Sequence, residues 1–462
     1  MKKKLIILIL VIGAFLRFFD LANVAQFEFD DQYNSYLVYN LIKNKDFSLI
    51  GQEGSFGGIY WGPWHYLYLT PFYFLTNLHP IGGYIAHSIL GLISIFSYYF
   101  VGKRLFNQNV GILAAFLRSI SFISIVNDRT ISPPYPAEIV ALWFIYFLVR
   151  FYQKEKLAIP ALAFLTGMMT STHVILFPLI IVWLILFFIK RPQVNLKLIG
   201  VSLLMIFIPI APLLIFEIRH KFIHILGFLK TLVGMENGVP IDLLSKMLYV
   251  ISYNTLNFYK FFDSWFLPSW LGVFLFLLIL FFLYKEKNAG YHKILFPLLF
   301  LAIVSYYIIY PRHTPEYYFM ALFPVILLYS SYLFFKIWNF SLGKIFCAIF
   351  LLVVTYSNLN QWYHIHVSPN KFALAQKEWA VKTIVDHQMG KGDFSISYFT
   401  EYGRHYGFQY FFTYYGLEPK REIKPPIYSI VMPKSQVAEK DLSASNGDIG
   451  LIFPEDEPEQ GQ

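Results

Sequence analysis

Cysteine and charged residues are scarce in this sequence. The single cysteine, Cys347, lies inside an apolar segment, so an intrachain disulfide is excluded and a cysteine-based metal site is not expected. Charged residues make up 14% of the 462 residues, whereas soluble chains contain about a quarter. Hydrophobic residues make up 57% and aromatic residues 20%. A soluble core could not bury so much apolar surface, and the composition therefore predicts an integral membrane protein.

Two features that would indicate other functions are missing. No glycine-rich phosphate loop is evident, which argues against a nucleotide-linked donor bound in the usual way. No internal repeat is evident either, and inverted repeats are typical of many transporters. The formal net charge of +9 does not indicate nucleic-acid binding, because lysine and arginine cluster in short loops between apolar segments. This distribution is the positive-inside pattern of a membrane protein.

Apolar segments predict about eleven transmembrane helices. We interpret Leu5–Phe15 as part of an uncleaved first span rather than a signal peptide, because Arg17 and Asp20 interrupt the approach to a cleavage site. The stretch 157–189 is too long for one helix, and the polar residues 170–173 divide it. A cytoplasmic N-terminus places the basic loops inside and the acidic, histidine-containing and aromatic loops outside. The predicted spans cover residues 5–22, 81–101, 109–127, 136–150, 157–172, 174–189, 197–216, 269–284, 294–310, 317–335 and 344–361.

The first external loop, residues 23–80, carries an acidic cluster where the chain leaves the membrane. Three carboxylates fall within the four residues Glu28-Phe29-Asp30-Asp31, and carboxylates at a bilayer face are costly unless they are hydrated or functional. Helical spacing from Asp31 to Ile42 predicts an amphipathic helix along this face, with Asp30 as its N-cap. The aromatic run 63–78 predicts a second juxtamembrane helix, because tryptophan and tyrosine favour the headgroup layer. Together these helices would form an external platform.

After Trp362 the composition becomes that of a soluble domain. A helical pattern and three extended stretches predict a small α/β domain, which the alternation of loops places outside the membrane. We expect the acidic tail from Pro454 to be disordered. The predicted organisation is therefore a membrane domain, 1–362, followed by an extracytoplasmic domain, 363–462. The helical pattern covers residues 371–388, and the extended stretches cover 394–399, 427–432 and 449–453.

Several motifs, in the same order over roughly residues 10–335, resemble the dolichyl-phosphate-mannose-protein mannosyltransferase family. The two most informative are Leu16-Arg17-Phe18-Phe19-Asp20-Leu21 and Phe29-Asp30-Asp31-Gln32. This sequence departs from the family where Asp31 replaces the commoner glutamate. It departs again at Gly62, a position where many relatives carry lysine near the lipid phosphate. Further matching segments are Gly62–Tyr68, Gly102–Phe106, Gly111–Ala115, Asp128–Arg129, Gly167, Thr172–His173 and Tyr317–Pro324.

The resemblance implies the GT-C fold and a place among membrane glycosyltransferases, a group that also includes the aminoarabinose transferases of lipid A. Such enzymes take a sugar from a polyprenyl-phosphate carrier and transfer it to a protein, lipid or glycan acceptor on the external face. The resemblance implies no cofactor, because the leaving phosphate is already activated. The expected fold is thus an all-α, multi-pass, GT-C-like membrane protein with a small C-terminal α/β domain.

Asp30 is the candidate general base, because a carboxylate is ionised at neutral pH and can accept the proton of an acceptor hydroxyl. We expect Asp31 to orient a sugar hydroxyl or to hold Asp30 in place. The two acidic residues could also join Asp128 in an oxygen-ligand site for Mg²⁺ or Mn²⁺, although the resemblance argues against a metal. Asp30 could equally serve as a helix cap, and capping and catalysis are compatible roles.

The donor phosphate requires external cations. Arg129 and Arg312 are the candidates, because arginine binds phosphate through two parallel hydrogen bonds; each could instead be an anchor at a helix end. Asp128 belongs to the same polar cluster as Arg129, and Arg17 is expected to pair with Asp20 or Asp30. His65, His173 and His313 could donate hydrogen bonds to phosphate or sugar, or could be structural.

Two other functions stay open at this level. The first is a transporter or flippase of lipid-linked sugars, and the second is a lipid-binding scaffold without catalytic activity. Charges concentrated in the external loops, mostly uninterrupted spans and the lack of an evident repeat favour the enzyme. The identities of the sugar and of the acceptor do not follow from the sequence.

Overall fold

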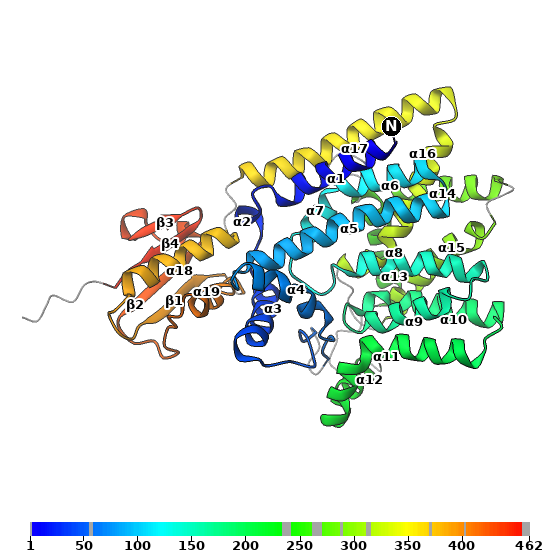
Figure 1. Cartoon of the computed structure of the whole chain (residues 1–462). Helices are drawn as coiled ribbons and strands as arrows, with labels where there is room; N and C mark the ends of the chain where they lie inside the picture. The colour runs from blue at the N-terminus through cyan, green and yellow to red at the C-terminus, as the bar shows by residue number, and fades with distance from the viewer. Residues whose placement is uncertain are drawn as a thin grey trace, which may run out of the picture.

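The computed structural model describes residues 2–54, 59–232, 242–260, 270–286, 290–310, 316–368, 372–401 and 403–454. Within these residues, long helices form one body and a small α/β domain lies at one end of it (Figure 1). A helix occupies each predicted span. These helices are α1 (Lys2–Phe18), α5 (Ile81–Leu105), α6 (Gln108–Ile120), α8 (Ala137–Tyr152), α9 (Ala158–Met169), α10 (Phe177–Lys190), α11 (Leu196–Arg219), α14 (Trp270–Lys285), α15 (His292–Ile309), α16 (Phe323–Ile337) and α17 (Ser341–Val367).

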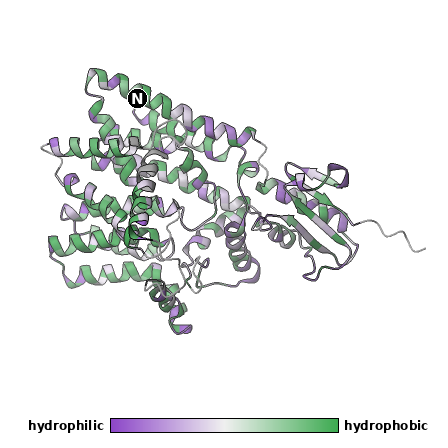
Figure 2. Cartoon of the chain, turned by 180° about the vertical axis from the view of Figure 1, so that it is seen from behind, coloured by the Kyte–Doolittle hydropathy of each residue, from purple (hydrophilic) through white to green (hydrophobic). Residues whose placement is uncertain are grey.

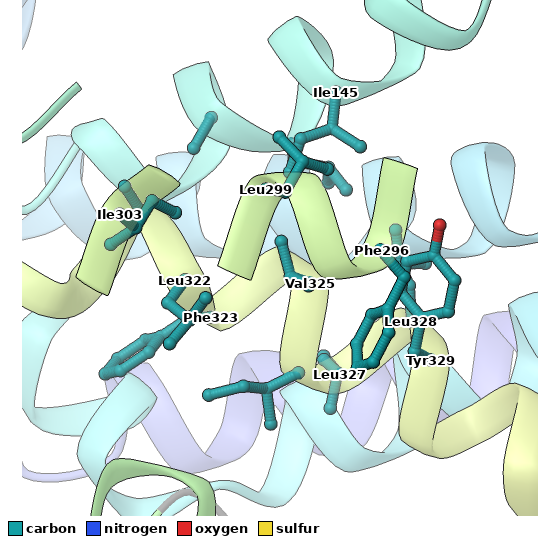
Figure 3. Packing of buried hydrophobic residues seen from close by; sticks show 14 of the residues in the cluster. Ile145, Phe296, Leu299, Ile303, Leu322, Phe323, Val325, Leu327, Leu328 and Tyr329 are labelled. Atoms are coloured by element: carbon teal, nitrogen blue, oxygen red, sulfur yellow. The ribbon is translucent and has the colours of Figure 1, made fainter. Parts of the chain in front are cut away.

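Hydrophobicity is spread over most of the helical body (Figure 2), and its distribution is that of a membrane protein. Among the described residues, five helical segments are long and apolar enough to cross a membrane, and the other apolar helices are shorter. Helix α16 lies at the centre, where Val325 and Leu328 pack against Phe296 and Leu299 of α15 and Ile145 of α8 (Figure 3). The outer helices α11 and α17 instead expose large apolar side chains, as helices in contact with lipid do.

Shorter helices complete the body. The predicted break at 170–173 is confirmed, because α9 ends at Met169 and α10 begins after a 3₁₀ turn. The predicted span 109–127 is not continuous, because α6 ends before Ser121 and a separate helix follows. The remaining helices are α2 (Leu21–Val24), α3 (Phe29–Tyr39), η1 (Asn40–Asn44), α4 (Trp64–Leu75), α7 (Phe122–Asn127), η2 (Val174–Leu176), α12 (Ile223–Leu232), α13 (Leu243–Lys260) and η4 (Glu316–Leu322).

Helices α3 and α4 lie at the end of the helical body that faces the C-terminal domain (Figure 1). Both predicted juxtamembrane helices are therefore present. The prediction that Asp30 caps the first of them is wrong. Glu28 occupies the N-cap position of α3, and its backbone N–H donates to the Asp31 carboxylate at 3.0 Å. Asp30 lies in the first turn, and its side chain is available for other partners.

A buried cluster of four charged residues joins the amino-terminal helices. Arg17 of α1 donates to Asp128 at 2.7 Å, and Arg118 of α6 binds both Asp128 at 2.8 Å and Glu138 of α8 at 2.9 Å. The expectation that Arg17 pairs with Asp20 or Asp30 is wrong, because the partner is 111 residues away in the sequence. Removing one member would leave an uncompensated buried charge, which typically costs about 3–5 kcal/mol. The cluster thus fixes the loop after α7 to α1 and α6.

The C-terminal domain is a four-stranded sheet with two helices. Strands β1 (Ser395–Thr400) and β2 (Ile427–Met432) pair in parallel. The segment that connects them contains α19 (Phe408–Tyr415). Strand β4 (Ile449–Ile452) pairs antiparallel with both β2 and β3 (Ala444–Asn446). The predicted helix and the three extended stretches are confirmed as α18 (Leu374–Gln388), β1, β2 and β4. Helix α17 continues to Val367, past the expected boundary, and residues 455–462 of the acidic tail lie outside the described residues.

The C-terminal domain holds the segment that leads into α3. Lys377 of α18 is fully buried, and its Nζ donates to the carbonyl oxygens of Phe27 and Tyr406, each at 2.7 Å. Burial lowers the pKa of Lys377 to about 8, so the ammonium is still mostly protonated near neutral pH. Arg404 adds an ion pair to Glu28 at 2.7 Å. The position of the acidic segment therefore depends on both domains.

Replacing Lys377 by Met should lower the melting temperature of the purified protein in detergent. The change leaves two carbonyl oxygens buried without their donor, which costs about 1–3 kcal/mol for each unsatisfied group. The control is Lys382→Met, an exposed position on the same helix. Equal melting temperatures for the two variants would show that the buried ammonium does not hold the domains together.

Candidate functional site

Asp30 lies in the first turn of α3 with its carboxylate held from two sides. Oδ1 accepts a hydrogen bond from Gln52 Nε2 at 2.5 Å, and Oδ2 accepts one from Ser132 Oγ at 2.9 Å. Gln52 belongs to the loop between η1 and α4, and Ser132 to the loop between α7 and α8. The side chain of Asp30 is half-buried, so it combines fixed partners with access to a ligand.

Two cavities of different character meet at Asp30 and Ser132. The first, about 340 Å³, extends from these residues toward apolar side chains of α10 and α11. The second, about 750 Å³, lies between the start of α3, the loop after α7, the end of α17 and the C-terminal domain. Residues of the first cavity include Glu53, Trp61, His173, Phe177, Ile180, Ile210, Tyr310, Tyr317 and Tyr318. Residues of the second include Glu28, Asp31, Arg129, Tyr135, Phe372 and Arg404.

Asp31 is buried and positions the loop that carries Ser132. Its Oδ2 accepts from the backbone of Glu28, and its Oδ1 accepts from the backbone N–H of Ile131 at 2.9 Å. Burial raises the pKa of Asp31 to about 7, although both hydrogen bonds favour the charged form. This geometry agrees with the expectation that Asp31 holds Asp30 in place, because it connects the two segments that carry Asp30 and its partner Ser132.

His173 forms one wall of the first cavity. Its ring lies 4.6 Å from that of Trp61 and 5.2 Å from that of Tyr318, measured between centroids. Burial lowers the pKa of His173 to about 3, so the ring is neutral at physiological pH. Nδ1 accepts from the backbone N–H of Ile175 at 3.4 Å, which places the ring proton on Nε2. His173 can therefore donate one neutral hydrogen bond but cannot supply a positive charge.

Arg129 lines the second cavity, and most of its donors are already used. Its Nε and Nη2 bind carbonyl oxygens at the end of α1, namely those of Leu16, Arg17 and Phe19. Nη1 is buried and has no hydrogen-bond partner among the described residues. Asp128, predicted in the same cluster, is paired with two arginines and lines neither of these two cavities.

The remaining predicted residues fall in different places. His65 is buried and bonded to Asn34 and His87, and it lines neither cavity. Arg312 and His313 lie outside the described residues. The nearest described residues in the chain are Tyr310 and, on the other side, Glu316 and Tyr317; Tyr310 and Tyr317 line the first cavity.

The structure explains the glycine at position 62. The backbone N–H of Gly62 donates to the carbonyl of Thr170 at 3.0 Å. A Cβ atom at Gly62 would lie 2.0 Å from Ser171 Oγ, which is too close for any contact. The start of α4 thus packs closely on the residues after α9, and a lysine at this position would require Ser171 to change its rotamer and shift slightly.

Gln52 and Ser132 were missed by the sequence interpretation. Ser132 precedes the Pro133-Pro134 pair in a loop that was recognised, but nothing in the sequence connects it to Asp30. Gln52 lies 22 residues from Asp30 and has no motif of its own. For a metal, the described residues contain no group of three or more His, Cys, Asp or Glu side chains arranged to hold one.

The sequence comparisons identify a family over part of the chain. The family described as dolichyl-phosphate-mannose-protein mannosyltransferase matches residues 62–216, which supports the resemblance drawn from the motifs. No curated protein matches the sequence.

Solved structures resemble the whole chain. ArnT from Cupriavidus metallidurans, bound to undecaprenyl phosphate, superposes with a TM-score of 0.62 at 10% identity, covering 97% of this chain and 98% of ArnT. The archaeal oligosaccharyltransferase AglB from Archaeoglobus fulgidus, in complex with an inhibitory peptide and a dolichol-phosphate, has a TM-score of 0.50 at 14% identity. That match covers 84% of this chain and 58% of AglB. The fold is therefore the GT-C fold, as expected.

The raised pKa of Asp31 predicts how stability depends on pH. A carboxyl whose pKa is about 7 when folded and near 4 when unfolded binds more protons in the folded state between these values. Its contribution to stability is therefore complete below about pH 4 and is lost as the pH rises through about 7. The slope is at most about 1.4 kcal/mol per pH unit.

Asp31→Asn removes this titration. Denaturant unfolding between pH 5 and pH 7.5 should show the wild type losing stability relative to the Asn variant as the pH rises. Parallel stability curves over this range would mean that the folded protein does not raise the pKa of Asp31.

Proposed function

Because residues 62–216 match the mannosyltransferase family and the whole chain has the GT-C fold, we propose that this protein is a membrane glycosyltransferase. It takes a sugar from a polyprenyl-phosphate carrier and transfers it to an acceptor on the extracytoplasmic face. The observation that carries the proposal is the position of Asp30, a carboxylate at the junction of two cavities. No cofactor is required in this scheme.

The first cavity suits the donor. Its walls on α10 and α11 are apolar, through Phe177, Ile180 and Ile210, and these helices belong to the part of the body that crosses the membrane. A prenyl chain can occupy such a surface, while the sugar and phosphate reach the polar end at Asp30. ArnT and AglB have been solved with undecaprenyl phosphate and dolichol-phosphate, which supports this class of carrier.

The second cavity suits the acceptor. It is more than twice as large, and the C-terminal domain contributes to its wall through Phe372 and Arg404. An acceptor hydroxyl placed there reaches Asp30 from a different cavity than the carrier. This arrangement keeps the two substrates apart until they meet at the carboxylate.

In the reaction, the acceptor oxygen forms a bond to the anomeric carbon, and the bond from that carbon to the phosphate oxygen breaks. The acceptor proton passes to Asp30, which acts as general base. The carrier leaves as polyprenyl phosphate, and its negative charge grows as the bond breaks. Groups whose contacts with the phosphate strengthen in the transition state therefore lower the barrier. Arg312 is the proposed cation, and His173 and His313 are proposed hydrogen-bond donors. Arg129 is a weaker candidate, because only its Nη1 is free.

Asp30→Asn should lower transfer of a radiolabelled sugar by about 10²–10⁴-fold, because the base is lost while the shape of the site is kept. The assay uses purified protein, polyprenyl-phosphate sugars and a membrane extract as the source of acceptor. Binding of undecaprenyl phosphate should change little. The control is Asp46→Asn, an exposed carboxylate in the same external loop.

Activity of the Asp30→Asn variant within a few-fold of the wild type would remove Asp30 from the chemistry. Loss of activity in both variants would indicate general damage to the loop rather than loss of a base.

We further propose that the N-terminus is cytoplasmic and the C-terminal domain extracytoplasmic, on the basis of the positive-inside pattern. Cys347 is buried, so single introduced cysteines can be labelled selectively. Lys440→Cys, exposed in the C-terminal domain, should react with an impermeant maleimide on intact cells. Lys156→Cys, exposed between α8 and α9, should react only after permeabilisation. The reverse pattern would place the candidate site inside the cell.

A further inference from the structure

A continuous chain of buried hydrogen bonds leads away from Asp30 into the protein. Gln52 Nε2 donates to Asp30 Oδ1 at 2.5 Å, and Asn34 Nδ2 donates to Gln52 Oε1 at 2.9 Å. Asn34 Oδ1 meets His65 Nδ1 at 3.0 Å, and His65 Nε2 meets His87 Nε2 at 3.0 Å. All four residues beyond Asp30 are less than 9% exposed. The chain of hydrogen bonds joins α3, α4, α5 and the loop between η1 and α4.

The chain has a single possible direction when Asp30 is ionised. A carboxylate only accepts hydrogen bonds, so Gln52 must turn its NH₂ group toward Asp30 and its oxygen toward Asn34. Asn34 must then donate, and its second N–H donates to the backbone oxygen of Asp30 at 2.8 Å. The oxygen of Asn34 faces His65, so His65 must carry its proton on Nδ1. Neutral His65 therefore accepts at Nε2, and His87 must donate from Nε2.

No member of the chain can turn alone. Reversing the Asn34 amide would break its bonds to Gln52, to the Asp30 backbone and to His65. Each buried polar group left without a partner costs about 1–3 kcal/mol. The orientation of Gln52 is therefore fixed by Asn34, His65 and His87, which line neither of the two cavities.

We propose that His65 and His87, acting through Asn34 and Gln52, are positioning residues that keep the Asp30 carboxylate in its proton-accepting form. This inference rests on the proposed role of Asp30 as the base. A fixed donor favours the charged carboxylate over the neutral acid. A Gln52 amide that was free to turn could instead present its oxygen to the protonated acid and stabilise it. The hydrogen-bonded chain prevents Gln52 from turning in this way, so the carboxylate stays ready to accept the proton of the acceptor hydroxyl.

The other charged or titratable groups that line the two cavities with Asp30 are Glu28, Asp31, Glu53, Arg129, Arg404, His173, His224, Tyr135, Tyr310, Tyr317 and Tyr318. These groups are unchanged in every variant that replaces only a residue of the hydrogen-bonded chain. A difference between such variants in the pH dependence of the rate therefore reports on the chain itself.

The first test reads the direction of the chain without any assay of activity. Histidine labelled with ¹⁵N distinguishes a ring protonated on Nδ1 from one protonated on Nε2. The wild-type protein should show His65 as the neutral Nδ1-protonated form, with the signal assigned by its loss in His65→Phe. Asn34→Leu removes the acceptor of His65 Nδ1 and cuts the chain between His65 and Asp30, so it should allow His65 to populate the other tautomer. His364, an exposed histidine on α17, should not change.

A wild-type His65 protonated on Nε2 would reverse the direction of the chain and overturn the proposal. An unchanged His65 signal in Asn34→Leu would also overturn it, because His65 would then be independent of the residues that lead to Asp30.

The second test uses the rate of sugar transfer. His87→Leu removes the last donor, whereas the amide nitrogen of His87→Gln is the same number of bonds from Cα as His Nε2 and can donate in its place. His87→Leu should lower kcat about tenfold, with little change in KM for the polyprenyl-phosphate sugar. The acid limb of its kcat/KM profile should move to higher pH by at least about 0.5 unit, because the charged form of Asp30 loses support. His87→Gln should restore most of both effects.

A purely structural role would lower the rate of His87→Leu at every pH and leave the acid limb in place, which would overturn the proposal. The same holds if His87→Gln and His87→Leu behave alike while both are folded by thermal melting. If the wild type transfers no sugar from any polyprenyl-phosphate donor, the proposed function fails, and the ¹⁵N signal of His65 still decides whether the chain exists.

Discussion

The buried ion pairs of Asp128 with Arg17 and Arg118 hold the candidate site together. In an apolar surrounding these charges are stabilised only by each other and by nearby carbonyl groups, so the loop that carries Asp128 has little freedom. That loop continues to Ile131, which binds Asp31, and to Ser132, which binds Asp30. The geometry at the candidate base is thus set by a cluster that no substrate is expected to touch.

Two further sets of contacts fix the position of Asp30. The C-terminal domain holds the segment before α3 through Lys377 and Arg404. The chain of hydrogen bonds through Gln52 comes from the helical body. Contacts from both domains and from the ion cluster therefore fix the position of Asp30. Its carboxylate still borders both cavities. A rigid carboxylate between two accessible spaces is what a transfer between a lipid carrier and a separate acceptor requires.

The sequence predicted the helices and the acidic site better than it predicted the contacts. Hydropathy was sufficient to place the spans, because a helix in lipid must be apolar along its length. The acidic segment was recognisable because carboxylates directly after an apolar span are unusual. Contacts between distant segments leave no such pattern. Asp20 was the nearest carboxylate to Arg17, but the fold brought Asp128 to it instead. Glu28 and Asp30 are both plausible caps, and only the backbone geometry distinguishes them.

Other misses have similar causes. Helix α19 is only eight residues long, and its many phenylalanine and tyrosine residues are as typical of a strand as of a helix. Gln52, Asn34 and His87 carry no motif, because their role depends on a hydrogen-bond partner at each end. The departure at Gly62 was visible in the sequence, but its reason, the contact with Ser171, was not.

The most direct measurement is an experimental structure of the Asp30→Asn protein with a polyprenyl-phosphate sugar bound. The account predicts that the prenyl chain follows Phe177, Ile180 and Ile210, and that the anomeric carbon lies beside residue 30 with the second cavity free. A carrier bound between α17 and the C-terminal domain, or a sugar far from residue 30, would contradict it.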